Sequence, residues 1–368
     1  MSDVAIIGAG GFVGSSLIES LVLGGNVGIR TVVRSFRNMA GLCRYGPAVD
    51  VHLADAEDPT ALASALTGSR TVINVTTGPP AGIVRSTRAI FDACSRAGVR
   101  RFIHLSSAVV YGDVSVPVID DAPPVSGHWM PYARAKAASE VWLRERLRDD
   151  SVEVVILRPG IVWGVRSPHT TDIVKSLAGK RGYLVDNGQG IFNGIYIDNL
   201  VSCIRACCDY PDRASGFYNV GDSESVTWRE FFDALGPPLG CDPSRLPQVR
   251  GDRFPWSMRA VIDSIQSLPL ANELYHRLKT YVPDGLKSGI RSRLEGNYGY
   301  ERHAASYAMR PAVDRELWHL QRVRYKLPVA KFENKFQFSP PVSFQEGICK
   351  TVVWLATLGL VPRLHPMS

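Results

Sequence analysis

Val4-Ala5-Ile6-Ile7-Gly8-Ala9-Gly10-Gly11-Phe12-Val13-Gly14 is the stretch of this 368-residue sequence that decides the fold. Its four apolar residues predict a buried parallel strand, and the apolar pattern from about Phe12 to Leu23 predicts a helix directly after the glycines. The glycines allow a tight turn, close approach of the backbone to a pyrophosphate, and close packing of helix on strand. The helix N-terminus would point at the phosphates. The stretch therefore predicts a dinucleotide-binding turn made by Gly8, Gly11, Phe12, Val13 and Gly14.

The second predicted strand, 29–33, is followed by Arg34, with Arg37 nearby. An acidic residue at this place would bind the ribose hydroxyls of NAD, whereas an arginine accommodates the 2′-phosphate of NADP. We therefore expect NADP(H) as the preferred cofactor, with NAD(H) also possible. The alternative is that Arg34 only caps the strand in solvent.

Three further apolar runs, 50–53, 71–75 and 101–105, are predicted as strands. Helical patterns separate them: Asp58-Pro59 supplies the cap and first residue of one helix, and 83–97 forms the next. Five strands that alternate with helices predict an α/β fold. We expect a Rossmann-type, doubly wound parallel sheet, which binds ligands at the carboxyl ends of its strands.

Tyr132-Ala133-Arg134-Ala135-Lys136 opens a predicted helix that continues to about Arg148. A tyrosine and a lysine four residues apart lie on one face of a helix, one turn from each other. A cation at that place favours the phenolate and is expected to lower the pKa of Tyr132, which would make it a usable general acid/base. The alternative for the pentapeptide alone is a surface tyrosine beside a solvated lysine.

Several motifs follow one another in an order that is specific as a set. They are Gly8-x-x-Gly11-x-x-Gly14, Leu53-Ala54-Asp55, Ser106-Ser107-Ala108-Val109-Val110-Tyr111-Gly112, Tyr132-x-x-x-Lys136 and Leu157-Arg158-Pro159-Gly160. Together they resemble the extended short-chain dehydrogenase/reductases, the NAD-dependent epimerase/dehydratase family. The resemblance covers about residues 1–235 and resumes over 338–355, where 339–347 looks like the family's terminal motif.

The resemblance implies a role for individual residues. Ser107, Tyr132 and Lys136 match the catalytic set, in which the tyrosine is the acid/base and the lysine also holds the nicotinamide ribose. On the cofactor side, Asp55 matches a residue near the adenine and Pro159-Gly160 match the segment beside the nicotinamide. The implied cofactor-binding residues, besides the glycine turn and the two arginines, are Asp55, Thr76, Tyr132, Lys136, Pro159 and Gly160.

Two departures from the family pattern bear on the reaction. Ala108-Val109 stands where the nucleotide-sugar 4,6-dehydratases carry an acidic pair, which argues against elimination of water. Arg34 replaces the acid that selects NAD. Because many epimerases of the family hold NAD permanently, this arginine favours a reductase or dehydrogenase with exchangeable NADP(H).

The second half of the chain is expected to bind the substrate. We divide the chain into an NAD(P)-binding domain, 1–160, and a substrate-binding lobe, 161–368. The segment 194–200 looks like the family's segment near the distal part of the substrate, although Asp198 could simply cap the helix that follows. A strand is predicted at 217–221, and Thr227 with Glu230 forms a capping-box pattern.

An insertion at about 238–330 departs from the family plan. Apolar residues at roughly helical spacing predict a helical cap with basic residues on its other face. It could be a lid over the substrate, a dimer contact, a membrane-surface element, or a part of the core. The apolar residues are Met258, Val261, Ile262, Ile265, Leu274, Leu278, Leu286, Ile290 and Leu294.

The net charge of +7 is concentrated in one segment, since residues 245–335 contain 17 Lys and Arg against 9 Asp and Glu. This segment could meet phosphates or be a solvated face, and nothing like a nucleic-acid-binding module accompanies it. Seven cysteines without CxxC pairs predict no disulfide framework and no metal site. No apolar run reaches the ~18 residues of a membrane span, and the chain enters a strand without a signal peptide. We expect a cytoplasmic protein without membrane contact.

The combined prediction is an NAD(P)-dependent oxidoreductase or epimerase that acts at a secondary alcohol or ketone carbon. By resemblance the substrate is a nucleotide-linked sugar or sugar-like molecule. One alternative is an NADPH-dependent ketoreductase, or an enzyme like the 3β-hydroxysteroid dehydrogenases, acting on an apolar small molecule. Another is an NAD(P)-sensing protein without activity. The resemblance also implies a homodimer joined through the helices at 83–97 and 131–148.

Overall fold

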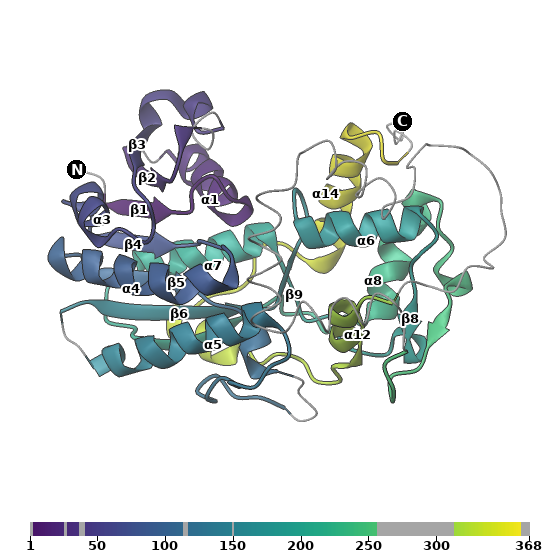
Figure 1. Ribbon diagram of the computed structural model, residues 1–368. Coiled ribbons are helices and arrows are strands. Elements are labelled where there is room, and N and C mark those ends of the chain that lie inside the picture. The colour runs from purple at the N-terminus through teal and green to yellow at the C-terminus, as the bar shows by residue number, and fades with distance from the viewer. Residues whose placement is uncertain are drawn as a thin grey trace, which may run out of the picture.

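The computed structural model describes residues 3–25, 28–36, 41–112, 117–148, 151–255 and 313–361 (Figure 1). Its centre is a sheet of seven parallel strands in the order β10-β6-β5-β4-β1-β2-β3. The Rossmann-type sheet is thus confirmed, and β6 and β10 extend it at one edge. The strands are β1 (Val4–Ile7), β2 (Ile29–Val33), β3 (Val49–Leu53), β4 (Thr71–Asn74), β5 (Arg101–Leu105), β6 (Glu153–Pro159) and β10 (Gly216–Val220).

Helices cover both faces of the sheet (Figure 1). One layer contains α3 (Pro59–Leu66), α4 (Pro80–Arg96) and α5 (Pro131–Arg144), and the other contains α1 (Phe12–Leu23) and α7 (Ile197–Asp209). Alternate strand residues face opposite layers, as strand geometry requires. Ile6 packs in the core with α1 and α7, whereas Ala5 and Ile7 pack in the core with α3, α4 and α5.

The chain changes direction across the sheet at β1, which pairs with β2 on one side and with β4 on the other. The connections that leave β1 and β4 therefore diverge at the carboxyl edge of the sheet. Ligands of open α/β sheets bind at such a switch point. The glycine turn follows β1, and Thr76 follows β4, so both lie at this place.

Most of the predicted helix starts agree with the structure, and their caps explain why. The α1 helix spans the predicted residues, and α4 begins three residues before the predicted start. Asp58 caps α3 by accepting from the backbone N–H groups of Thr60 (3.0 Å) and Ala61 (3.1 Å). The helix predicted to reach Arg148 instead changes at Glu145 into the short 3-10 helix η3 (Glu145–Arg148).

Part of the chain beyond the sixth strand forms a smaller lobe outside the central sheet. It holds the two-stranded pairs β7 (Ile161–Trp163) with β9 (Gly194–Tyr196) and β8 (Leu184–Val185) with β11 (Gln248–Val249). Its centre is aromatic, with the rings of Phe192 and Phe231 stacked at 4.0 Å between centroids. The helices of this half are α6 (Pro168–Ala178), α8 (Trp228–Leu235), α12 (Arg315–Arg322), α13 (Ala330–Phe336) and α14 (Phe344–Thr357). The predicted capping box opens α8, where the Thr227 side chain accepts from the Glu230 N–H and the Glu230 carboxylate from the Thr227 N–H.

The remaining 3-10 helices are η1 (Cys43–Ala48), η2 (Ala108–Tyr111), η4 (Asp186–Gly188), η5 (Pro237–Leu239) and η6 (Pro243–Arg245). Some segments after residue 160 return to the central sheet, because β10 pairs with β6 and α7 packs beside α1. The division at residue 160 into a cofactor domain and a substrate lobe stays a proposal. The apolar residues that predicted a helical cap, Met258 to Leu294, lie outside the described residues.

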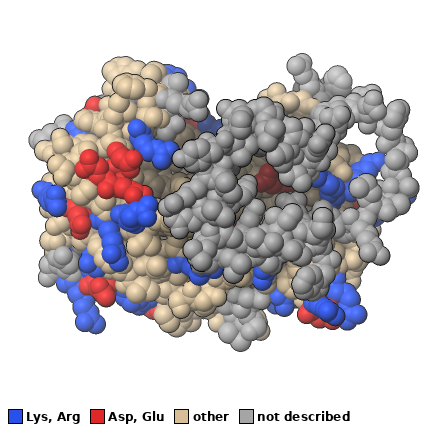
Figure 2. Space-filling model, viewed as in Figure 1, with Lys and Arg blue, Asp and Glu red and all other residues tan. Residues whose placement is uncertain are grey.

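Within the described residues, no helix combines the length and apolar character needed to span a membrane. The apolar run 352–361 is partly the C-terminal half of α14, whose Val352 and Leu355 are buried in the core. On the face of the molecule in Figure 2, the described Lys and Arg side chains are interspersed with Asp and Glu.

Candidate functional site

The glycine turn after β1 has the geometry that its sequence predicts. Gly8 has φ +93°, a left-handed conformation that favours glycine. A Cβ atom on Gly14 would collide with the carbonyl oxygen of Gly8 and lie 2.9 Å from the Cα of Ala9. Gly8 itself packs against β4, since its Cβ would lie 3.0 Å from the backbone nitrogen of Thr76. No side chain larger than hydrogen fits these positions without a shift.

The N-terminus of α1 can accept an anion. Gly11 is the N-cap residue, no side chain caps the helix, and its first turn has no acidic residue. The first N–H groups of a helix lack partners within that helix and favour negative charge. Phe12, Val13 and the glycines therefore fit the pyrophosphate of a dinucleotide, which the backbone can approach closely here.

β2 and β3 end side by side, so Arg34 and Asp55, which follow them, lie at the same edge of the sheet. Val33 and Leu53, which pair in register, directly precede this edge. Both side chains are exposed, and the Asp55 Oδ1 atom accepts from the backbone N–H of Glu57 at 2.9 Å. No ion pair to Arg34 is made by the residues that the structure describes. Arg37 lies outside them.

Lys136 is buried at the carboxyl edge of the sheet, with 1% of its surface exposed. Its Nζ atom donates to the carbonyl oxygen of Leu105, the last residue of β5, at 2.8 Å. The same atom lies 5.9 Å from the centroid of the Tyr132 ring. Burial lowers the pKa of Lys136 to about 8, against the opposing effect of the Glu140 carboxylate. Tyr132 and Lys136 thus share one face of α5, as predicted.

The pKa of Tyr132 differs from the prediction. Burial, followed by the negative charge of Glu316, raises the pKa of Tyr132 to about 12. The predicted net lowering of the Tyr132 pKa is therefore wrong. Removing the half-buried phenol from water disfavours the phenolate more than the neighbouring ammonium favours it.

Ser107 lies two residues after β5, the strand whose last carbonyl oxygen accepts from Lys136. It is the N-cap residue of η2, and its Oγ accepts from the backbone N–H of Val109 at 3.3 Å. The η2 turn packs against α5. Ser107, Tyr132 and Lys136 therefore come from the same corner of the sheet, where β5 ends and α5 begins.

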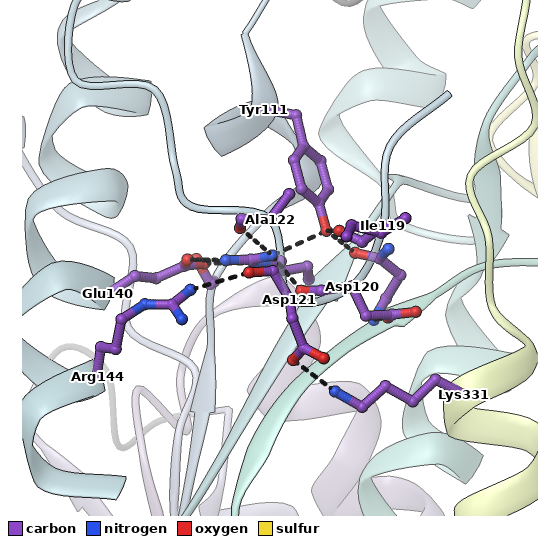
Figure 3. Close-up of polar contacts among 11 residues, drawn as sticks. Tyr111, Ile119, Asp120, Asp121, Ala122, Glu140, Arg144 and Lys331 are labelled. Carbon is purple, nitrogen blue, oxygen red and sulfur yellow. Dashed lines mark hydrogen bonds and ion pairs between the residues drawn. The ribbon is translucent and has the colours of Figure 1, made fainter. Parts of the chain in front are cut away.

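A buried ion pair that the sequence analysis missed lies under this corner (Figure 3). The Arg158 guanidinium binds the Glu140 carboxylate through Nε at 3.1 Å and through Nη2 at 2.5 Å. Ser106, the neighbour of Ser107, donates its hydroxyl to the same carboxylate at 2.5 Å. Glu140 stands four residues after Lys136, so its helix face was the signal that could have revealed it.

The free side of Arg158 extends the network (Figure 3). Its Nη1 donates to the Tyr111 hydroxyl at 2.8 Å and to the carbonyl oxygen of Asp120 at 2.6 Å. Tyr111 donates in turn to the Oδ1 of Asn219 on β10 at 2.7 Å. The segment after β5, which carries Ser107, is thus fixed to α5, β6 and β10 at once.

A second buried pair orients Thr76. Asn74 and His104 are opposite each other on β4 and β5, with 3.1 Å between Nδ2 and Nδ1. The Oδ1 of Asn74 accepts from the Thr76 backbone N–H at 3.0 Å and from its hydroxyl at 2.7 Å. Burial, with Lys136 nearby, holds the pKa of His104 well below its usual value, so this imidazole is neutral.

Pro159 and Gly160 lie where the central sheet meets the smaller lobe. Pro159 is the buried end of β6, and the Gly160 N–H donates to Val220 at 3.2 Å. A Cβ on Gly160 would collide with the carbonyl oxygen of Asn193. The contact holds the β6–β7 connection tightly against the segment that leads into β9.

The two interpretations of Asp198 are not equally supported. The N-cap residue of α7 is Tyr196, so Asp198 does not cap this helix. Asp198 lies in the first turn, exposed, and pairs with Lys350 of α14 at 3.4 Å. Within the described residues, no group of three or more His, Cys, Asp or Glu side chains could hold a metal ion.

Comparison with known proteins identifies one family. The family model described as "NAD dependent epimerase/dehydratase family" matches residues 4–221. A UDP-glucose 4-epimerase of Vibrio cholerae is 27% identical over 263 residues, which are 67% of this chain and 78% of that protein. A 3 beta-hydroxysteroid dehydrogenase/Delta 5-->4-isomerase of Mycobacterium tuberculosis is 27% identical over 295 residues, 70% of this chain and 75% of that protein.

Solved structures agree with the fold. The crystal structure of the dTDP-glucose 4,6-dehydratase DesIV from Streptomyces venezuelae, with NAD bound, superposes with a TM-score of 0.67 at 20% sequence identity. The match covers 96% of this chain and 97% of that one.

Proposed function

Since the chain belongs to the NAD dependent epimerase/dehydratase family, we propose that it transfers hydride at a secondary alcohol or ketone carbon, with Tyr132 as the acid/base. One observation supports this above the others. The buried Lys136 Nζ is tied to Leu105 and lies 5.9 Å from the Tyr132 ring, at the carboxyl edge of the sheet. Burying a lysine ammonium group costs folding free energy, so its burial here is not explained by stability. Beside a phenol, at the sheet edge where a dinucleotide would bind, it can assist proton transfer.

The cofactor that we propose is NADP(H), with NAD(H) as the alternative. The backbone of Gly8, Gly11, Phe12, Val13 and Gly14 would hold the pyrophosphate, and Arg34 would bind the 2′-phosphate. Asp55 would lie near the adenine, and Thr76 and Pro159-Gly160 near the nicotinamide. Bound there, the nicotinamide would supply or accept the hydride.

The chain's own residues would handle the proton. The Tyr132 hydroxyl would give a proton to the reacting oxygen, or take one from it, depending on the direction. Ser107 would donate a hydrogen bond to the same oxygen and hold it in line with the tyrosine. Lys136 would stabilise negative charge on the phenol, which is needed because burial keeps the pKa of Tyr132 high.

As substrate we propose a nucleotide-linked sugar or a sugar-like molecule, oxidised or reduced once or epimerised through a transient ketone. The similarity to a UDP-glucose 4-epimerase supports this class. The turn Ala108-Val109 has no carboxylate to assist the removal of water, so we do not propose dehydration.

An apolar ketone or sterol-like alcohol is the second candidate. It is favoured by the equal similarity to a 3 beta-hydroxysteroid dehydrogenase/Delta 5-->4-isomerase and by the aromatic surface that Trp129 contributes near Tyr132. We further propose a cytoplasmic homodimer joined through α4 and α5. An NAD(P) sensor without activity would not require Ser107, Tyr132 and Lys136 together.

The test begins with the purified protein. Any nucleotide released on denaturation is identified, and NADPH and NADH are then titrated. UDP-sugars and small ketones are screened for turnover with the wild-type protein and with Y132F. We expect nucleotide binding in both and turnover only in the wild type. Failure of both nucleotides to bind, or full turnover by Y132F, would overturn the proposal.

A further inference from the structure

The helix α12, which lies near the end of the basic insertion at 238–330, packs against the lobe through one of its faces. Gln321 is fully buried, and its Oε1 accepts from the backbone N–H of Val185 at 2.8 Å. Trp318 is buried on the same face and donates its Nε1–H to the carbonyl oxygen of Arg250 at 3.1 Å. Asp314 caps the helix by accepting from the N–H of Leu317 at 2.9 Å. These contacts fix the direction in which the remaining face points.

That other face meets the segment that leads into the catalytic helix α5. The Arg315 guanidinium lies over the Trp129 ring, 4.4 Å from its centroid. The His319 ring, one turn along α12, stacks on the same tryptophan at 5.5 Å between centroids. Trp129 precedes Tyr132 by three residues, so these contacts bring the first turn of α12 beside the proposed acid/base.

Glu316 is the acidic residue of this turn. Because Arg315 and His319 of the same helix pack on Trp129, Glu316 lies close enough to the Tyr132 phenol for its negative charge to raise the pKa of Tyr132. The side chain is exposed, and within the described part of the chain it forms no ion pair. Although part of the side chain is exposed, partial removal of the carboxyl group from water raises the pKa of Glu316 to about 7, and the like charge of Asp314 acts in the same direction. The other ionisable groups at this place are Arg315 and His319, which stack on Trp129, and Lys136 behind the tyrosine.

We propose that Glu316 is a specificity-determining residue, which accepts a hydroxyl or amino group beside the reacting carbon of the substrate and rejects an anionic substituent there. This rests on the proposed function, because it takes the reacting oxygen to lie at the Tyr132 hydroxyl. Substituents next to that oxygen then face the carboxylate. A hydroxyl or ammonium can donate to it, whereas a carboxylate or phosphate would be repelled and would lose its hydration without a partner.

The diphosphate of a nucleotide-linked sugar would have to lie away from this helix. Arg315 does not offset the repulsion, since its guanidinium is placed over the Trp129 ring. The substrate would therefore be neutral or cationic close to the carbon that is oxidised or reduced.

The test uses E316Q, which keeps the shape of the side chain and removes its charge. The matched control is E145Q, which removes an exposed carboxylate at the far end of α5, where it pairs with its neighbour Arg146. Two substrate pairs differ by a charge near a carbonyl or carbinol carbon: UDP-glucose with UDP-glucuronate, and ethyl acetoacetate with acetoacetate. The ratio of kcat/KM between the neutral and the anionic member is measured in all three proteins at about pH 8.5, where a carboxyl group with a pKa of about 7 is ionised.

We expect E316Q to raise the relative kcat/KM of the anionic member by about 10-fold or more, as loss of one close charge predicts. E145Q should leave the ratio as in the wild type. An unchanged ratio in E316Q overturns the inference.

A second readout needs no turnover. In full-length protein, 3,5-difluorotyrosine in place of Tyr132 gives a more acidic phenol, which is titrated by 19F NMR with and without the E316Q change. An increase of about 3-fold or more in its acid dissociation constant supports the inference, and no change overturns it. If the titration shifts while no substrate pair reacts, the proposed substrate class fails and the role of Glu316 beside Tyr132 stands.

Discussion

The Glu140 carboxylate and the Arg158 guanidinium form an ion pair from which water is excluded, since neither side chain has exposed surface. The pair joins α5, the helix of Tyr132 and Lys136, to the end of β6. The Glu140 carboxylate also accepts a hydrogen bond from the hydroxyl of Ser106, the neighbour of Ser107. The helix and the loop that carry the proposed catalytic residues are therefore held by the same two charges.

Removal of one partner of this pair should destabilise the protein strongly. Glu140→Ala leaves a buried guanidinium without its counter-charge, and such changes cost about 3–5 kcal/mol. Urea denaturation measures the loss. Arg85→Ala, which breaks the exposed pair with Glu57, is the control and should leave the unfolding midpoint unchanged. Equal effects of the two changes would contradict the importance of burial.

Tyr132→Phe should reduce kcat by about 10²–10⁴-fold, the usual contribution of a positioned acid/base. The ring remains, so its packing beside Lys136 is kept, and NADPH should bind as in the wild type. Stopped-flow measurement of the hydride step separates chemistry from product release. A fall in nucleotide affinity of the same size as the fall in kcat would argue for a binding role instead.

Lys136 should make stability depend on pH in the alkaline range. Its pKa is about 8 in the folded protein and near 10.5 when unfolded, so the folded state binds fewer protons between these values. Stability should therefore rise as pH rises from 8 toward 10.5.

Between pH 7.5 and 9.5 we expect wild type to gain about 2 kcal/mol relative to Lys136→Met, which carries no titrating group. Urea unfolding of both proteins at each pH gives the difference directly. Parallel pH profiles for the two proteins would show that the lysine keeps an ordinary pKa.

Arg34 should set the cofactor preference. Arg34→Asp removes the partner of a 2′-phosphate and supplies an acceptor for ribose hydroxyls. The ratio of the NADPH and NADH affinities should shift by about 10-fold or more toward NADH, which is about 1.4 kcal/mol. Fluorescence titration measures both constants. Arg96→Ala removes an exposed arginine from α4 and should leave the ratio unchanged; no shift in Arg34→Asp would favour the view that Arg34 only caps its strand.

Gly14→Ala should abolish dinucleotide binding. Its Cβ would collide with the carbonyl oxygen of Gly8, so the turn would have to open. We expect at least about 100-fold weaker binding of NADPH, since misplaced phosphate contacts are lost together. Gly41→Ala adds the same methyl group where no atom lies within 4 Å, and it should bind normally.

The fold was predictable because its signals are local. The strand before Gly8, the caps at Asp58 and Thr227, and the four-residue spacing of Tyr132 and Lys136 are all readable within a few residues. What escaped prediction depends on residues far apart in sequence. Burial, and a carboxylate from α12, decide the pKa of Tyr132, and neither is visible near residue 132. The Glu140–Arg158 pair escaped prediction for the same reason, although Arg158 belongs to one quoted motif and Glu140 follows another by four residues.

The order in which the chain leaves the ribosome has a consequence for its last helices. β10 is an edge strand of the sheet, and α13 covers it, with Phe332 and Phe336 packed edge-on against Tyr218. More than a hundred residues separate the strand from this cover. A nascent chain that already contains every proposed cofactor-binding and catalytic motif still lacks the two phenylalanine rings that pack on Tyr218. Among the described residues, this cover of a strand at the sheet edge therefore comes late in synthesis, and edge strands are where sheets associate with other chains.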